Sequence, residues 1–153
     1  MFEELNKHKY LDLLEIGETD EWEFRLVIAE AGAAENSPPV TPDEEANDNI
    51  RKLLNESKPI EVTKSSKLYE IVFSDYITYS VTNESYSNEC EPDTYEGNLA
   101  RIYSKSTFLD YVANSTFATS DYPGPFKHYG FCCLNHIIDV VSMEPPKVKV
   151  INA

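Results

Sequence analysis

Glycine, cysteine and basic residues are all scarce in this sequence, and each shortage excludes a class of protein. Five glycines among 153 residues leave no glycine-rich loop of the kind that cradles phosphates or dinucleotides. Three cysteines, two of them adjacent at positions 132 and 133, do not suit a disulfide framework and favour a reducing compartment. No apolar run is long enough for a signal peptide or a membrane span. We therefore expect a cytoplasmic protein.

The charge balance narrows the expected partners. The chain has thirteen Lys and Arg residues and twenty-seven Asp and Glu residues, which gives a formal net charge of −14. The electrostatic field of a protein with this negative charge repels nucleic acid and anionic membranes, so we expect neither as a partner. It favours a basic protein partner, or it serves solubility alone.

Period-two alternation of apolar residues predicts strands. Residues 22–28 alternate apolar with polar positions and are expected to form a hairpin with residues 10–16. Residues 68–82 alternate in the same way, with one interruption at Asp75. Either Asp75 lies in a turn or bulge, or its carboxylate points inward and must find hydrogen-bond donors.

Two helices are expected from their starting signals. Thr41, Pro42 and Glu44 match a capped helix start, and the apolar spacing that follows predicts a helix through residue 55. Several capping residues at 104–107 precede a second, shorter helix. Hydrophobic content of 41% is sufficient for one core, so we predict a single domain spanning residues 1–153. The predicted class is α+β: a mainly antiparallel twisted sheet or incomplete β-sandwich with two or three packed helices.

The segment 128–142 contains the residues most suited to catalysis, namely thiols, an imidazole and a carboxylate. On a helix, Cys132, Cys133, His136 and Asp139 would share a face and resemble a catalytic triad. On a single strand, Cys133 and Asp139 would lie on one face while Cys132 and His136 lay on the other. The β-branched residues favour the strand, so we expect no catalytic site. The alternative is a small hydrolase or transferase that uses His136, Cys133 and Asp139, or His128 with a nearby acid or thiol.

No metal or cofactor is expected. The adjacent cysteines lack the two-residue gap of zinc sites, and no calcium-loop spacing occurs among the acids.

Tyrosines in acidic loops indicate a binding surface. Nine of the ten tyrosines fall between Tyr69 and Tyr129, and tyrosine offers a large contact area at low entropic cost. The expected partner-binding residues are Tyr86, Glu89, Glu91, Asp93, Tyr95 and Tyr122.

Residues 101–112 and 126–142 are similar to segments of small bacterial cytosolic proteins, some of them of the immunity type that neutralises secreted toxins. The resemblance covers about the C-terminal third of the chain, includes no catalytic motif and implies no site residue. It implies a non-enzymatic binding role. We therefore predict an acidic protein-binding module, immunity-like, for a basic partner. An edge strand that pairs with a second copy also stays open.

Overall fold

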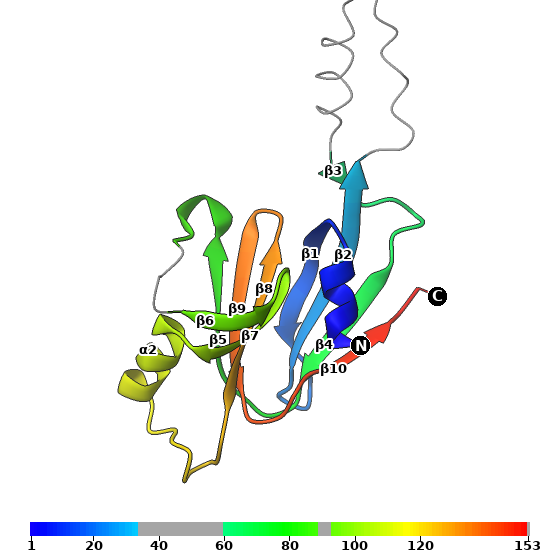
Figure 1. Ribbon diagram of the computed structural model, residues 1–153. Helices are drawn as coiled ribbons and strands as arrows, with labels where there is room; N and C mark the ends of the chain where they lie inside the picture. Colours follow the sequence, from blue (N-terminus) through cyan, green and yellow to red (C-terminus); the bar gives the residue numbers. More distant parts are fainter. Residues whose placement is uncertain (34–59, 89–92, 153) are drawn as a thin grey trace, which may run out of the picture.

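The computed structural model describes residues 1–33, 60–88 and 93–152. The helix predicted at 41–55 lies outside these ranges. Within them the chain is mostly antiparallel β-sheet, arranged as two sheets with few helices (Figure 1).

The first sheet has the strand order β1-β2-β4-β10, with the short β3 paired to β2. Its alternating burial follows the period-two pattern of the sequence, since successive side chains point to opposite faces. The predicted hairpin at the start of the chain is confirmed by the antiparallel pairing of β1 with β2. The strands are β1 (Tyr10–Glu18), β2 (Phe24–Ala33), β3 (Ile60–Glu61), β4 (Leu68–Phe73) and β10 (Lys147–Val150).

The second sheet has the order β5-β9-β8-β7-β6. Every neighbouring pair in it is antiparallel. Short turns join β6 to β7 and β8 to β9, a connection that antiparallel neighbours permit. Its strands are β5 (Tyr76–Asn83), β6 (Thr94–Gly97), β7 (Ala100–Lys105), β8 (Lys127–Cys133) and β9 (His136–Ser142).

The described helical elements are short. A 3₁₀ helix, η1 (Phe2–Lys7), begins the chain, and another, η2 (Glu84–Tyr86), follows β5. The α-helix α2 (Thr107–Ser115) lies on the side of the second sheet that faces away from the first sheet (Figure 1). The predicted capping is confirmed, because the Ser106 side chain accepts the Leu109 N–H.

One hydrophobic core is shared by both sheets. Phe73 of the first sheet meets Tyr129 and Phe131 of the second at ring-centroid distances of 5.4 and 6.2 Å. Phe2 of η1 adds edge contacts to the same two rings. Full burial of a Phe side chain contributes about 1.5–3 kcal/mol, so these rings are a main source of stability.

The segment 128–142 is a hairpin, and the prediction of one continuous strand is wrong. Leu134 and Asn135 form a two-residue turn between β8 and β9. Asn135 has a positive φ of 65°, a conformation that Asn tolerates better than most residues. A hydrogen bond from Leu134 N to Leu11 O, 2.8 Å long, also ties this turn to β1.

The acid at position 75 lies in a turn, as the first of the two alternatives predicted. Asp75 is exposed between β4 and β5. Trp22, which was expected to start a half-buried strand over residues 22–28, lies in the β1–β2 turn with a φ of 63° and is 78% exposed.

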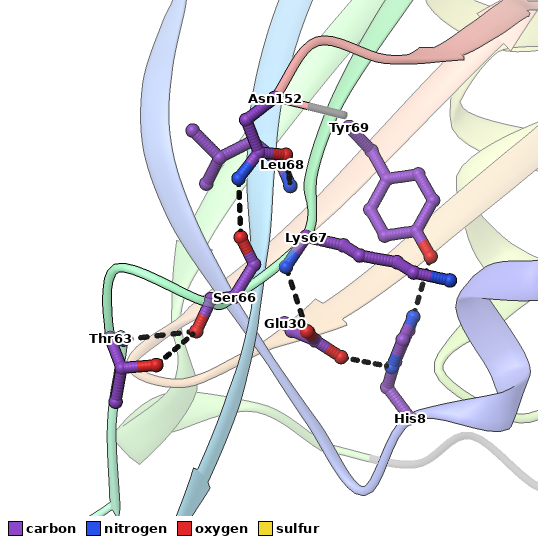
Figure 2. A network of polar contacts seen from close by, with 8 residues as sticks. All are labelled: His8, Glu30, Thr63, Ser66, Lys67, Leu68, Tyr69 and Asn152. Carbon is purple, nitrogen blue, oxygen red and sulfur yellow. Dashed lines mark hydrogen bonds and ion pairs between the residues drawn. The ribbon is translucent and has the colours of Figure 1, made fainter.

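A polar network joins His8, between η1 and β1, to strands β2 and β4 of the first sheet (Figure 2). His8 Nδ1 lies 2.9 Å from a Glu30 carboxylate oxygen, and His8 Nε2 lies 2.6 Å from the hydroxyl of Tyr69. Glu30 also accepts the backbone N–H of Lys67 at 2.7 Å. Tyr69 is fully buried, so His8 supplies the hydrogen-bond partner that a buried hydroxyl requires.

Candidate functional site

A cavity of about 440 Å³ opens on the outer face of the second sheet, beside α2. Its floor consists of β7, β8 and β9, and its walls come from the start of α2 and from residues that flank β6. The lining residues are Ser87, Asn88, Asp93, Tyr95, Arg101, Tyr103, Thr107, Phe108, His128, Cys132, Ile137 and Asp139.

The strand register explains why these side chains share a face. Tyr129, Phe131 and Cys133 of β8 point into the core. The alternate side chains of β8, those of His128 and Cys132, therefore point to the cavity. Cys132 is opposite Ile137 and Gly130 is opposite Asp139 in the β8–β9 ladder, so the cavity-facing side chains of β9 join the same face.

A hydrogen-bonded chain of Ser106, His128 and Asp139 forms one side of the cavity. Ser106 Oγ lies 2.8 Å from His128 Nδ1, and His128 Nε2 lies 2.6 Å from Asp139 Oδ1. Because a carboxylate accepts, Nε2 carries the proton that goes to Asp139, and in the neutral imidazole Nδ1 then accepts the Ser106 hydroxyl. Both ring nitrogens of His128 are thus occupied.

Aromatic rings hold the imidazole in place. The Tyr103 ring stacks on His128 with centroids 4.0 Å apart and an interplanar angle of 9°. Phe108 of α2 contacts the same imidazole at 5.0 Å. His128 is only 2% exposed, whereas the Asp139 side chain is 21% exposed. Asp139 is therefore the member of the chain that meets solvent in the cavity.

Arg101 contributes a cation to the opposite side. Its guanidinium carbon lies 4.2 Å from the centre of the Tyr95 ring, a cation–π geometry. Arg101 Nε donates to Asn98 O at 2.7 Å, and Nη1 donates to the Tyr103 hydroxyl at 3.4 Å. Burial raises the pKa of Tyr103, so this hydroxyl stays protonated at neutral pH and able to donate in turn.

Gly130 makes room between the two charged side chains. Arg101 pairs with Gly130 across β7 and β8, and Gly130 pairs with Asp139 across β8 and β9. A Cβ atom at Gly130 would lie 2.8 Å from a ring carbon of Tyr103. Because glycine has no Cβ atom, the Tyr103 ring can lie directly over the backbone of Gly130.

The turn before β7 is fixed by a side chain from η1. Asn6 Oδ1 accepts the backbone N–H groups of Asn98 and Ala100 at 2.9 and 2.8 Å. Gly97 in the same turn has a φ of 99°, and a Cβ there would lie 2.1 Å from Ala100 O. These constraints hold the end of the β6–β7 hairpin from which Arg101 projects.

The alternative catalytic set predicted from the sequence is divided between two faces. Cys133 and His136 are directly opposite each other on the core face, whereas Asp139 lines the cavity on the other face. Burial raises the pKa of the Cys133 thiol far above its usual range, which keeps the sulfur inert. His136 Nδ1 is buried and has no hydrogen-bond partner in the described part of the chain.

The residues predicted to bind a partner are also separated. Asp93 and Tyr95 line the cavity, and Asp93 Oδ1 accepts the Thr107 N–H at the start of α2. Tyr86 is 82% exposed at the end of η2 and Tyr122 is 66% exposed in the loop after α2. Glu89 and Glu91 lie outside the described residues.

Sequence reasoning did not assign Ser106 or Arg101 to a site, and it named His128 only with an unspecified acid or thiol. A turn at Leu134 and Asn135 sets Asp139 on the cavity face of β9, but no strong turn signal marks these two residues in the sequence.

Comparisons with known proteins found no family model, no curated protein and no solved structure that matches this chain. Within residues 1–33, 60–88 and 93–152, no helix has the length and apolar character that crossing a bilayer requires. In the same ranges, no three His, Cys, Asp or Glu side chains converge as a metal site.

Proposed function

We propose that the protein is a non-enzymatic binding module for a basic protein partner, and that the loop of residues 116–126 makes the central contact. The observation that carries the proposal is the exposure of two large rings in that loop. Phe117 is 83% exposed and Tyr122 is 66% exposed. Their rings stack with centroids 6.1 Å apart. Exposed, clustered aromatic rings are the usual anchors of protein interfaces.

Hydrogen bonds hold this loop in shape before any partner arrives. Thr119 Oγ1 accepts the N–H groups of Asp121 and Tyr122, both at 3.2 Å. The Thr119 N–H donates to Tyr122 O at 2.7 Å, and Thr116 Oγ1 accepts the Ala118 N–H at 3.2 Å. A preorganised loop loses little conformational entropy on binding, so more of the contact energy becomes affinity.

The charge of the chain supports a basic partner. The formal net charge is −14, and exposed acids include Asp121, next to Tyr122 in the loop, and Asp110 on α2. Attraction between opposite net charges accelerates encounter and is screened by salt. An immunity-like role in the cytoplasm is consistent with this chemistry and with the resemblance of residues 101–112 and 126–142.

We also propose that the chain forms one domain, an incomplete β-sandwich with two or three packed helices. The core that both sheets share supports the single domain and the packing of the sheets.

Affinity capture with matched baits tests the function. The wild-type chain, a Phe117→Ala/Tyr122→Ala variant and a Trp22→Ala control are used as baits in lysate of the native cell. Trp22 is 78% exposed but lies in the first sheet's β1–β2 turn. We expect a basic protein on the wild-type and control baits, lost from the loop variant and weakened in high salt. Replacement of a hot-spot residue costs about 2 kcal/mol or more, roughly 30-fold in affinity.

Equal capture by the loop variant would contradict the assigned contact. Capture of an acidic protein, or of a second copy of this chain alone, would contradict the proposed partner. Sedimentation of the purified protein at several concentrations identifies self-association.

A small hydrolase or transferase is a second candidate, because the cavity gathers His128, Cys132 and Asp139. Both nitrogens of His128 are engaged by other groups, so this imidazole cannot take a proton from a thiol without losing a contact. Alkylation of the native protein with iodoacetamide, followed by peptide mapping, measures the reactivity of Cys132. Reaction faster than that of glutathione at neutral pH supports this candidate, and slower reaction counts against it.

A further inference from the structure

The cavity holds groups of opposite charge at the two ends of one cross-strand row. Arg101 and Asp139 are two strands apart, which places their Cα atoms roughly 10 Å from each other, and Gly130 between them has no side chain. We propose that this cavity binds a small zwitterion of the apolar α-amino acid class, with the ligand carboxylate at Arg101 and its ammonium at Asp139.

The carboxylate end is prepared by the contacts that fix the guanidinium. Arginine has five N–H donors in a planar fork. The bonds to Asn98 O and to the Tyr103 hydroxyl use two of them, and the Tyr95 ring supports one face of the plane. The remaining donors and the Tyr103 O–H can bind a carboxylate, for which arginine has bidentate geometry.

The ammonium end is prepared by the buried hydrogen-bonded chain. Ser106 orients His128, and His128 donates to Asp139 Oδ1. A carboxylate with one oxygen held in this way presents its second oxygen to the cavity, where it can accept from an ammonium group. Asp93, which caps α2 with one oxygen, adds negative potential on the same lining.

The mixture of charges selects against simpler ligands. An anion without an amine would meet Asp93 and Asp139 uncompensated, and a cation without a carboxylate would meet Arg101. Each mismatch places like charges together or leaves a charged group desolvated without a partner, which is how binding sites discriminate. A zwitterion satisfies both ends at once.

Size and lining define the remainder of the ligand. A volume of about 440 Å³ falls within the range of small-molecule sites. Tyr95, Phe108 and Ile137 add apolar surface to the lining of the same cavity. An apolar or aromatic ligand side chain would contact this surface.

Calorimetric titration of the full chain with related probes tests the inference. The probes are L-phenylalanine, L-leucine and L-methionine, with 3-phenylpropanoate as the analogue without an ammonium and 2-phenylethylamine as the analogue without a carboxylate. We expect at least one amino acid to bind, and both phenylalanine analogues to bind at least about tenfold more weakly than L-phenylalanine.

Variants assign the contacts. Asp139→Asn and Arg101→Gln should each weaken amino acid binding by at least about tenfold. Asp75→Asn, the same change at an exposed turn, should leave it unaltered. Circular dichroism verifies that each variant is folded, and the comparison of probes on the wild-type chain decides the matter even if a variant fails to fold.

Two results would overturn the inference. The first is the absence of binding by all three amino acids at millimolar concentrations. The second is equal affinity for L-phenylalanine and for either analogue, because one of the two ligand charges would then contribute nothing to binding.

Discussion

Replacing Ser106 by alanine should destabilise the protein far more than the loss of an ordinary exposed serine. Its hydroxyl oxygen caps α2 by accepting the Leu109 N–H at 3.0 Å, and loss of such a cap costs about 1 kcal/mol. Its O–H donates to His128 Nδ1, and His128 is 2% exposed. A buried acceptor left without a partner costs about 1–3 kcal/mol. The free energy of unfolding should therefore fall by about 2–4 kcal/mol.

Urea denaturation of four chains separates the two contributions: wild type, Ser106→Ala, His128→Phe and the double variant. Phenylalanine keeps a ring that can stack on Tyr103 but has no nitrogen to leave without a partner. In the His128→Phe background, Ser106→Ala should cost only the cap, about 1 kcal/mol. Ser104→Ala, at an exposed serine whose hydroxyl makes a 3.3 Å contact, serves as the control and should cost less than about 0.5 kcal/mol.

An equal cost of Ser106→Ala in both backgrounds would refute the reasoning. It would mean that the hydroxyl and the imidazole are not energetically coupled. The hydrogen-bonded chain behind Asp139 would then have no role in positioning that carboxylate.

Two further predictions concern an ion pair and a glycine. The pKa of Glu70 lies below its usual value because Arg25 and Lys149 bond its carboxylate. This contribution to stability is complete above the unfolded-state pKa and is lost as the pH falls from about 5 through the lower folded-state pKa. The free energy of unfolding, measured by urea denaturation, should therefore fall less steeply with decreasing pH for Glu70→Gln than for wild type. An equal pH dependence in the two proteins would contradict the pairing. Gly130→Ala should cost about 1–3 kcal/mol and displace the Tyr103 ring from His128, an effect visible in the imidazole NMR shifts. Gly17→Ala, where no atom lies within 4 Å of the added Cβ, should be nearly neutral, and similar losses at both glycines would contradict this account.

Local signals were sufficient for some elements. Period-two alternation located the β1–β2 hairpin, and the polar residues before α2 located its cap at Ser106. The interruption at Asp75 indicated a turn in an otherwise apolar alternation. Each of these features depends on residues close together in the chain, so the sequence carries the information directly.

The hairpin of β8 and β9 shows why the site could not be predicted. Leu134 and Asn135 are flanked by apolar residues on both sides and include neither Gly nor Pro, so no strong turn signal marks them. In one continuous strand, Cys133 and Asp139 would share a face. In the hairpin, Cys133 is opposite His136, so odd positions of β8 share a face with even positions of β9, and Asp139 moves to the cavity side.

Neighbouring residues and composition are enough to specify the alternation of the strands, the capping of α2 and the strongly acidic charge. The meeting of Ser106, His128 and Asp139, and the position of Arg101 across Gly130 from the carboxylate, follow from the folded arrangement alone. These contacts depend on the register of strands brought together by core packing. A register is a relation between distant segments, and no local pattern specifies it.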